Sequence, residues 1–343
     1  MPEQALTVGK LATAAQGNAR ATSVALATNA EPYRCVLSDQ PMFLVPERLI
    51  PASPAADSGS PLVVNPSCWY SWRGKPPADV AAAAKLLGAA NVHDIVWVRD
   101  QHSGSVFPYW LGEELRTILE NTAPGDPLPN AIEHRPLRLL RSSAIAFAPD
   151  ESVRRREAWT ASMAAARTQF EKGYAPLAGL IPAFHLGEMR RYFRRRIRTG
   201  AFPLGDDQSV LRHIAYNEPV ARFFHQQLAG LMSQVAGEPV KPSYCYFASY
   251  QGGAVLEKHT DREQCEFSIT FCVDYTPEPE AQTEWPIHLD TPRGVVTVYQ
   301  AIGDALFYRG CRVPHYRKRL RRDATSSSIF FHYVRESFAG SLD

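Results

Sequence analysis

The sequence predicts an α+β protein whose C-terminal part is a β-barrel or a double-sheet jelly roll. Past Pro242, short segments rich in β-branched and aromatic residues follow one another, separated by Gly, Pro and Asp. Before Pro242, apolar residues recur instead at helical spacing. An apolar content of 45% and a charged content of 21% are ordinary for a globular chain of 343 residues. These observations favour a helical region followed by a β-rich core.

The N-terminal part mixes strand and helix signals. Residues 1–35 are rich in Ala, Thr and Asn without periodicity, so we expect a flexible leader there. Residues 36–135 are expected to form an N-terminal α/β extension of unknown role, ending in a Pro-rich linker at 121–137. Its strand-like segments are PMFLVPERLI, PLVVNPSCWYSW and VHDIVWV, and its helix-like segments are ADVAAAAKLLGAA and YWLGEELRTILEN.

Residues 136–240 are expected to supply helices that brace the β-rich core. One helix is predicted in SVRRREAWTASMAAARTQFEKG, a second in FHLGEMRRYFRRRIRTG, and a third from NEPV to the residue before Gly237. The second helix would bury Met189, Phe193 and Ile197 and leave its arginines solvated. We favour that interpretation of the basic run over a nucleic-acid-binding patch.

Residues 241–336 are expected to form the β-rich core. Phe267, Ile269, Phe271 and Val273 alternate with small or polar residues, as in a strand buried on one face. The predicted strands lie in SYCYFASY, CEFSITFCVDY, PIHLDT, GVVTVYQ, DALFYRG, VPHYRKRL and SSSIFFHYV.

A candidate metal site precedes the strand that begins near Phe267. His259 and Asp261 are two residues apart, so on an extended chain both side chains project to the same side. His315, on a later predicted strand, is the natural third ligand. Two imidazoles and one carboxylate on one face of a metal leave the opposite positions open, which suits non-haem Fe(II).

The segments YQGGAVLEKHTD, GDALFYRGCRVPHYR and SSSIFFHYV closely resemble the Fe(II)- and 2-oxoglutarate-dependent oxygenase superfamily, in particular its prolyl-hydroxylase-like branch, over residues 180–335. The resemblance implies a double-stranded β-helix (jelly-roll) core with His259, Asp261 and His315 as iron ligands. It implies Fe(II), O₂ and the co-substrate 2-oxoglutarate, with ascorbate as a stimulant. Tyr250 would then donate a hydrogen bond to 2-oxoglutarate.

One position departs from the family's pattern. Its members usually carry a Lys or Arg shortly after the distal histidine to pair with the far carboxylate of 2-oxoglutarate, and here that position is Thr325. A buried carboxylate needs a charge-assisted partner, which Arg provides best. If the strand after His315 stays regular, alternate arginines share the face of that histidine. The expected anchors are Arg317 and then Arg319, with a hydroxyl contact from Ser326 or Ser328.

The resemblance implies an oxidoreductase, a dioxygenase that hydroxylates a C–H bond of an amino acid, a peptidyl residue or another small molecule. Asp261 argues against halogenation, because related halogenases have a small residue at that position. Two alternatives stay open. One is a non-catalytic jelly roll that binds a metal or a partner, and the other is desaturation or cyclisation by the same oxidant. The substrate and the oligomeric state stay open as well.

Bulk properties narrow the partners and the location. A formal net charge of +2 gives no reason to expect nucleic acid or a membrane surface as a partner. No apolar run reaches the length of a membrane span or forms a signal peptide. The six cysteines have no regular spacing, so we expect free thiols and a cytoplasmic protein.

Four other motifs have both a structural and a functional interpretation, and the structural one is favoured for each. A second His-x-Asp pair would serve at a strand end, and a histidine on an apolar strand would be a hydrogen-bonded core residue. A run of His and Asp residues that could bind a metal would form a polar loop instead. A cluster of aromatic residues would pack into the core rather than line a substrate groove. The residues are, in that order, His288 and Asp290; His332; His93, Asp94, Asp100 and His102; and Trp69, Tyr70 and Trp72.

Overall fold

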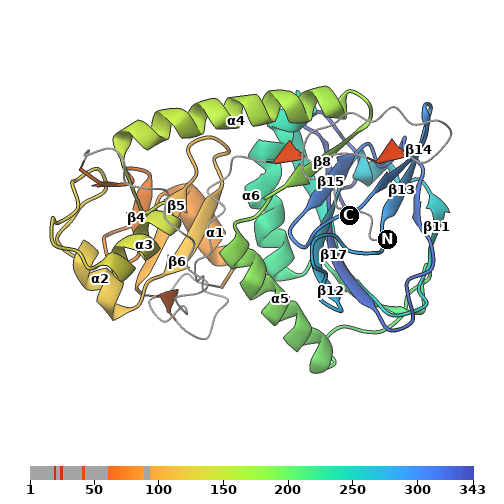
Figure 1. Ribbon diagram of the computed structural model, residues 1–343, viewed down its shortest axis with the longest axis horizontal. Helices are drawn as coiled ribbons and strands as arrows, with labels where there is room; N and C mark the ends of the chain where they lie inside the picture. Colours follow the sequence, from red (N-terminus) through yellow and green to blue (C-terminus); the bar gives the residue numbers. More distant parts are fainter. Residues whose placement is uncertain (1–18, 21–23, 26–40, 43–60, 89–92) are drawn as a thin grey trace, which may run out of the picture.

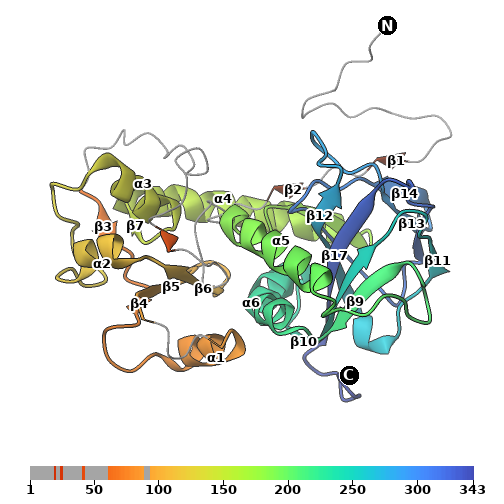
Figure 2. The same cartoon turned by 90° about the horizontal axis from the view of Figure 1, so that it is seen from below.

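Figure 1 shows the computed structural model of the protein, which describes residues 19–20, 24–25, 41–42, 61–88 and 93–343. The chain folds as a mixture of helices and mostly antiparallel sheets. The elements between residues 63 and 147 and the C-terminal strands lie at opposite ends of the molecule, with three helices running between them (Figures 1 and 2). These helices are α4 (Pro149–Phe170), α5 (Ala183–Arg198) and α6 (Pro219–Ala236).

A seven-stranded sheet forms one layer of the C-terminal part. Its neighbouring strands are antiparallel, except that the short edge strand β2 runs parallel to β8. Strands β8 and β9 come from the range 136–240, in which only helices were predicted. In spatial order the strands are β2 (Val24–Ala25), β8 (Tyr174–Ala178), β15 (Ala305–Tyr308), β12 (Phe267–Thr276), β17 (Thr325–Arg335), β10 (Val240–Tyr250) and β9 (Arg212–Tyr216).

A five-stranded sheet lies against the inner face of the seven-stranded one. In spatial order its strands are β1 (Ala19–Arg20), β14 (Gly294–Val298), β13 (Ile287–Thr291), β16 (His315–Arg317) and β11 (Leu256–His259). From β10 onward the chain passes back and forth between the two sheets: β10, β12, β15 and β17 belong to the first, and β11, β13, β14 and β16 to the second.

The outer face of the seven-stranded sheet is apolar and covered by helices. Phe193 of α5 stacks on Phe247 of β10 with ring centroids 4.3 Å apart, and Phe170 of α4 stacks on Phe307 of β15 at 4.4 Å. The alternation predicted for β12 is confirmed, because its apolar set belongs to this core while Ser268 faces the other sheet. Burial of such rings contributes about 1.5–3 kcal/mol each.

Helix α6 has a carboxylate at its start and a glycine at its end. The Glu218 carboxylate accepts hydrogen bonds from the backbone amides of Val220, at 2.9 Å, and Ala221, at 3.0 Å, which satisfies two free donors of the first turn. Pro219 occupies the first turn, where a missing N–H costs nothing. Gly237 ends the helix at φ 76°, a conformation that residues with a Cβ adopt only with strain.

The N-terminal part contains a three-stranded antiparallel sheet, a two-stranded sheet and three helices. The strands and helices predicted between residues 61 and 121 are present, but the second helix is shorter because Tyr109 and Trp110 belong to a strand. The segment PMFLVPERLI lies almost entirely outside the described residues. The elements are β4 (Cys68–Tyr70), β5 (Ile95–Arg99) and β6 (Val106–Trp110), β3 (Val63–Val64) with β7 (Ala146–Phe147), and α1 (Ala78–Leu86), α2 (Glu113–Leu119) and α3 (His134–Ser142).

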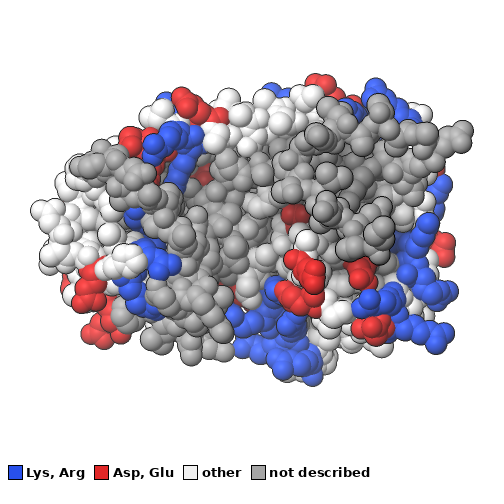
Figure 3. Space-filling view, viewed as in Figure 1, with Lys and Arg blue, Asp and Glu red and all other residues white. Residues whose placement is uncertain are grey.

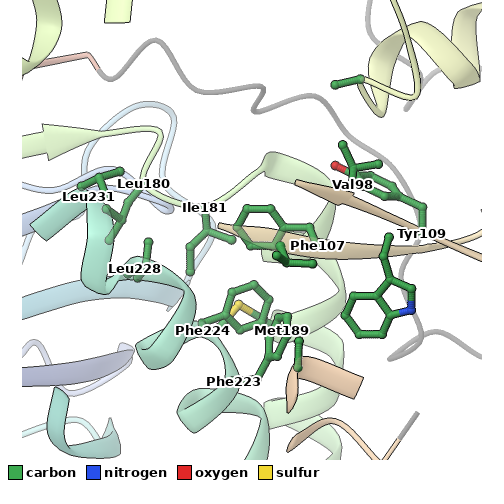
Figure 4. Close-up of a cluster of buried hydrophobic side chains, with 14 of the residues drawn as sticks. Val98, Phe107, Tyr109, Leu180, Ile181, Met189, Phe223, Phe224, Leu228 and Leu231 are labelled. Atoms are coloured by element: carbon green, nitrogen blue, oxygen red, sulfur yellow. The ribbon is translucent and has the colours of Figure 1, made fainter. Parts of the chain in front are cut away.

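One hydrophobic core joins the N-terminal part to the helices (Figure 4). Phe107 of β6 lies beside Phe224 of α6 with ring centroids 6.1 Å apart. His185 of α5 is fully buried between them, 5.3 Å from the ring of Phe107 and 5.7 Å from that of Phe224. The helices therefore present apolar side chains both to the sheet and to the N-terminal part.

The leader predicted at residues 1–35 is described only at β1 and β2, and the rest of it lies outside the described residues. Strand β1 pairs in parallel with β14, and β2 pairs in parallel with β8. Each of the two C-terminal sheets therefore takes one short edge strand from this segment.

Two predictions from composition can be compared with the described residues. Five cysteines there are free, and Cys35 is not described; the five are Cys68, Cys245, Cys265, Cys272 and Cys311. No helix among the described residues combines the length and the apolar character that crossing a bilayer requires.

The basic run of α5 is divided between ion pairs and solvent. Met189 and Phe193 are buried as predicted, and Ile197 is partly buried. Arg190 and Arg194 both hydrogen-bond to the Asp274 carboxylate of β12, at 3.0 Å from Nε and 2.7 Å from Nη2 respectively. The remaining positive charge gathers where α5 ends (Figure 3).

Candidate metal centre and its pocket

Three predicted ligands meet between the two sheets. His259 ends β11 and His315 begins β16, and the two residues are register partners in the five-stranded sheet. Their ring centroids are 4.3 Å apart. Asp261 Oδ1 lies 3.6 Å from His259 Nε2 and 3.5 Å from His315 Nε2. One ligand atom from each residue lies within 4.8 Å of the other two, so the three side chains could hold one ion.

Backbone carbonyls orient both imidazoles. His259 Nδ1 lies 2.8 Å from the carbonyl oxygen of Glu257, and His315 Nδ1 lies 3.0 Å from that of Val313. A carbonyl only accepts, so each Nδ1 carries the proton and each Nε2 keeps its lone pair on the side of Asp261. A metal-binding histidine commonly has this second hydrogen bond.

A hydroxyl relay orients the carboxylate. Ser268 Oγ of β12 donates to Asp261 Oδ2 at 2.8 Å and lies 2.9 Å from His332 Nδ1 of β17. Because the single hydroxyl proton goes to the carboxylate, His332 Nδ1 is the donor to Ser268. Asp261 therefore has one oxygen held by Ser268 and the other turned to the imidazoles. This arrangement agrees with the favoured interpretation of His332 as a hydrogen-bonded core residue.

A glycine is required behind the carboxylate. A Cβ on Gly310 would lie 2.4 Å from Asp261 Oδ2 and 2.4 Å from Ser268 Oγ, far inside van der Waals contact. The carbonyl of Gly310 also accepts a hydrogen bond from the Asp261 amide at 3.0 Å. The loop before β16 thus approaches the carboxylate as closely as a backbone can.

The charge states of the cluster suit a metal ion. Burial opposes ionisation of Asp261, but the neighbouring His259 and His315 hold the pKa of the carboxyl below its ordinary value. The nearby carboxylate raises the pKa of His259, whereas burial lowers the pKa of His315. Metal binding needs a deprotonated carboxylate and a neutral imidazole, and Asp261 and His315 already favour these forms.

The cluster opens into a pocket of about 330 Å³, within the range of about 300–1,000 Å³ that is usual for small-molecule sites. Its wall combines the three candidate ligands with tyrosines and with charges of both signs. The other lining residues are Asp206, Asp207, Gln208, Arg212, Tyr216, Tyr244, Tyr246, Tyr250, Leu256, Arg262, Tyr308, Phe330 and His332.

Sequence reasoning missed Arg212, a buried arginine in this wall. It lies on β9, a five-residue strand between helical segments that no pattern singled out. Its Nε donates to Asp206 at 2.9 Å and its Nη1 to the Tyr250 hydroxyl at 3.0 Å. Tyr246 donates to the same Asp206 carboxylate. Asp206, Arg212, Tyr246 and Tyr250 thus form one hydrogen-bonded wall, and the predicted 2-oxoglutarate residue Tyr250 is part of it.

Arg317, the expected anchor, is buried beside the cluster. It follows His315 by two residues on β16 and is 4% exposed. Its guanidinium donates to the Trp285 carbonyl and, at 3.0 Å, to Gln300 Oε1, and lies 4.8 Å from the centroid of the Trp285 ring. Among the described residues no carboxylate forms an ion pair with Arg317. Burial lowers its pKa, and tyrosines and a thiol are the leading groups that act on its charge.

A polar group near Arg317 lacks a hydrogen-bond partner among the described residues. The hydroxyl of Tyr275 on β12 is buried and forms no hydrogen bond with the described residues. Tyr275 shares a buried cluster with Tyr250 and Trp285 and acts electrostatically on Arg317. Sequence reasoning missed Tyr275, since a tyrosine near a strand end gives no signal that its hydroxyl is unsatisfied.

Arg319 does not lie on the face of His315. Strand β16 ends at Arg317, so the alternation on which that prediction depended does not continue. Arg319 is exposed and donates to the Gly253 carbonyl at 3.1 Å. Ser328 is buried on β17, where its register partners are Ala248 and Cys272. It lies on the same face of the strand as the pocket residues Phe330 and His332.

The other motifs behave as structural residues. His288 Nδ1 lies 3.0 Å from Thr297 Oγ1, and Asp290 pairs with Lys258 at 2.7 Å. In the predicted polar loop Asp94 pairs with Arg116 at 2.8 Å, and Asp100 accepts from the His102 amide at 2.8 Å. Within the described part of the chain, the groups able to hold an ion all include Asp261. None of Trp69, Tyr70 and Trp72 lines the pocket.

No protein-family model and no curated protein sequence matches this chain. It is similar to solved structures of the non-heme alpha ketoglutarate dependent epimerase SnoN from nogalamycin biosynthesis (15% identity, 51% of this chain, 84% of that chain, TM-score 0.44) and of a Pseudomonas putida prolyl-4-hydroxylase (18%, 51%, 99%, 0.41). A 2OG-Fe(II) oxygenase family oxidoreductase from Burkholderia pseudomallei is similar too (13%, 52%, 92%, 0.41). The likeness covers about half of this chain at low identity, so the chemistry proposed below rests on the side chains of the site.

Proposed function

We propose that this protein is an Fe(II)- and 2-oxoglutarate-dependent oxygenase that hydroxylates a C–H bond, with an amino acid or peptidyl residue as substrate. One observation carries the proposal: two imidazoles and one carboxylate meet at a pocket, each with its second polar atom held by the protein. This donor set suits Fe(II) and leaves one side of the ion for other molecules.

The arrangement of the two sheets supports this function, because it fits a double-stranded β-helix. From β10 to β17 the chain alternates between the sheets, so the ends of β11 and β16 come together at one opening. In such a layer every strand buries one face against the other sheet. Ligands placed on strands and backed by that packing are held more rigidly than ligands on free loops.

The unsatisfied groups around Arg317 support 2-oxoglutarate as the co-substrate. A buried guanidinium with no carboxylate partner is costly, and the distal carboxylate of a dicarboxylic acid would offset that cost with charge-assisted hydrogen bonds. The Tyr275 hydroxyl would donate to the same carboxylate. The keto-acid end would then reach toward the iron ligands, since Arg317 and His315 are close neighbours on β16. Arg317 thus replaces the cation that Thr325 does not supply.

The division of roles follows from these positions. Bound Fe(II) with 2-oxoglutarate and O₂ would supply the oxidation of the substrate C–H bond. His259, Asp261 and His315 hold the ion, Ser268 keeps one carboxylate oxygen turned away from it, and Arg317 sets the direction of the co-substrate. The tyrosine-rich wall confines the substrate and excludes water.

The test is formation of succinate from 2-oxoglutarate with Fe(II), O₂ and ascorbate, comparing the natural protein, Asp261→Ala and His288→Gln. We expect turnover in the natural protein and in His288→Gln, because the second His-x-Asp pair lies outside the pocket. Asp261→Ala removes one of three ligands and should abolish turnover. The mass of an oxidised product separates hydroxylation, a gain of oxygen, from desaturation or cyclisation, a loss of two hydrogens.

Failure would take a clear form. If the natural protein neither binds 2-oxoglutarate nor forms succinate, the site belongs to a non-catalytic metal- or partner-binding protein. Near-normal activity of Asp261→Ala would contradict the ligand assignment.

A further inference from the structure

The mouth of the pocket carries a second arginine whose charge no acid compensates. Arg262 directly follows Asp261 in the chain, lines the same pocket and is exposed. In the part of the chain that the structure describes, no carboxylate forms an ion pair with it. The other arginine of the mouth, Arg212, is neutralised by Asp206. Among the described residues that line this pocket, the cations are Arg212 and Arg262, and Arg262 is the one without an acid partner.

Arg262 is held in place by aromatic and backbone contacts. Its Nε donates to the Tyr244 hydroxyl at 3.2 Å, and its guanidinium carbon lies 4.7 Å from the centroid of the same ring. Tyr244 in turn stacks on Tyr216 at 5.0 Å. The Arg262 carbonyl accepts from the Cys265 amide and from Cys311 Sγ, both at 2.9 Å. A side chain restrained in this way loses less conformational entropy when it binds an anion.

The walls beside Arg262 are aromatic and remain partly exposed. Tyr216 is 46% exposed, and Tyr246 and Phe330 are half-buried at the same mouth. Flat rings left open to solvent favour contact with an apolar, planar group. The cation and the aromatic wall therefore fit a ligand that has an anionic group at one end and a planar apolar group at the other.

We propose that Arg262 binds the carboxylate of the substrate, and that the substrate is a small free carboxylic acid with a planar apolar body. This inference rests on the proposed function, because the bound acid is taken to be the molecule oxidised at the metal centre. It narrows the substrate class to free acids, since a residue inside a peptide has its α-carboxyl group in an amide bond. A guanidinium and a carboxylate match in plane and spacing, which gives paired hydrogen bonds.

The charge balance of the mouth favours a carboxylate over a phosphate. Asp206 and Asp207 line the same pocket as Arg262. Arg212 offsets the charge of Asp206, but the carboxylate of Asp207 would repel a dianion more strongly than a monoanion. A single negative charge next to Arg262 therefore fits the mouth best.

The experiment uses protein loaded anaerobically with Fe(II) and 2-oxoglutarate, titrated by calorimetry with three probes: phenylacetate, its neutral isostere phenylacetamide, and phenyl phosphate. The variants are Arg262→Gln, Tyr244→Phe and, as a control on the exposed side of α4, Arg156→Gln. We expect phenylacetate to bind more tightly than the other two probes. Arg262→Gln should weaken phenylacetate about 10- to 100-fold, because a charge-assisted hydrogen bond is lost, and should leave phenylacetamide unchanged.

Tyr244→Phe should weaken phenylacetate by less than Arg262→Gln does, since the guanidinium stays but its restraint is lost. Arg156→Gln should bind all three probes as the natural protein does. The proposal is overturned if phenylacetate does not bind, if the amide binds as well as the acid, if Arg262→Gln binds phenylacetate normally, or if phenyl phosphate is preferred.

Failure of the proposed function gives a different result. A protein that does not take up 2-oxoglutarate in the presence of Fe(II) refutes the oxygenase assignment before any probe is added. Normal uptake of 2-oxoglutarate by Arg262→Gln, together with lost selectivity for the acid, supports the role of Arg262 alone.

Discussion

The two faces of the seven-stranded sheet treat their polar groups differently. On the helix-covered face two polar groups have partners in the protein: Nε2 of His225, on α6, lies 2.7 Å from the His332 carbonyl, and Asp274 is held by two arginines of α5. On the face toward the five-stranded sheet, the Arg317 guanidinium lacks an acid among the described residues, and the Tyr275 hydroxyl is unsatisfied.

This difference separates the residues that stabilise the fold from those that await a ligand. A buried polar group is normally satisfied, so the Tyr275 hydroxyl, beside a buried arginine without an acid partner, is a place where another molecule could complete the hydrogen bonds. With the proposed Fe(II) and 2-oxoglutarate bound, the inner face would gain partners for these groups, whereas the outer-face groups named above already have theirs. Substitutions on the outer face should therefore affect stability, and those on the inner face binding.

The largest effect is expected on the outer face. Phe247→Ala removes a fully buried ring that stacks on Phe193, and should lower the free energy of unfolding by about 3–5 kcal/mol. Phe330→Ala, on the inner face and half-buried, should cost less than half as much. Chemical unfolding curves of the two variants check this contrast, and equal losses would contradict it.

Arg317→Met should show the opposite pattern. The apolar side chain removes an uncompensated buried charge, so the free energy of unfolding without ligand should stay equal or increase. The Kd for 2-oxoglutarate should rise about 10- to 150-fold, since a charge-assisted interaction of about 1.5–3 kcal/mol is lost. Calorimetric titration measures the Kd. A comparable rise in Arg319→Met, with none in Arg317→Met, would move the anchor to Arg319.

A pair of Ser→Ala substitutions removes the same hydroxyl group from each of the two faces. Ser268→Ala removes the hydroxyl that holds Asp261 Oδ2 and should weaken Fe(II) affinity by about 10- to 100-fold. Ser327→Ala on the outer face removes a hydroxyl that lies 2.9 Å from Ser249 Oγ and should leave Fe(II) affinity unchanged. Competition with a chromophoric chelator measures both values, and similar affinities in the two variants would refute the relay.

The last expected effect is a dependence of stability on pH. Burial lowers the pKa of His225 from 6.5 to about 3, so the unfolded chain takes up a proton that the folded chain excludes. His225 therefore contributes nothing unfavourable above pH 6.5, and the free energy of unfolding falls as the pH drops from 6.5 towards 3.

Unfolding curves of metal-free protein between pH 7 and pH 4 measure this slope. His332 adds a term of the same sign, because burial lowers its pKa from 6.5 to about 4. His225→Gln should reduce the slope of the free energy of unfolding against pH, because one of the two buried histidines no longer contributes. An unchanged slope in that variant would show that His225 does not contribute.

Sequence patterns predicted most of the regular elements and the three candidate ligands, but they missed strands β8 and β9 and parts of the site. The alternation along β12 and the periodicity of α5 and α6 are local, and the structure keeps them. The prediction for Arg319 depended on a strand continuing past Arg317, and the strand stops there because the chain turns out of the sheet. Arg212 and Tyr275 could not be predicted, because their roles depend on contacts between residues distant in the sequence.

By itself the sequence determined which faces of its strands and helices are apolar and that His259 and Asp261 point the same way, because side-chain direction follows from backbone periodicity. Only the tertiary structure decided that His315 joins them, that Arg212 is neutralised, and that Arg317 and Arg262 keep their charge. Ion pairing depends on distance through space, and the packing of the two sheets sets that distance.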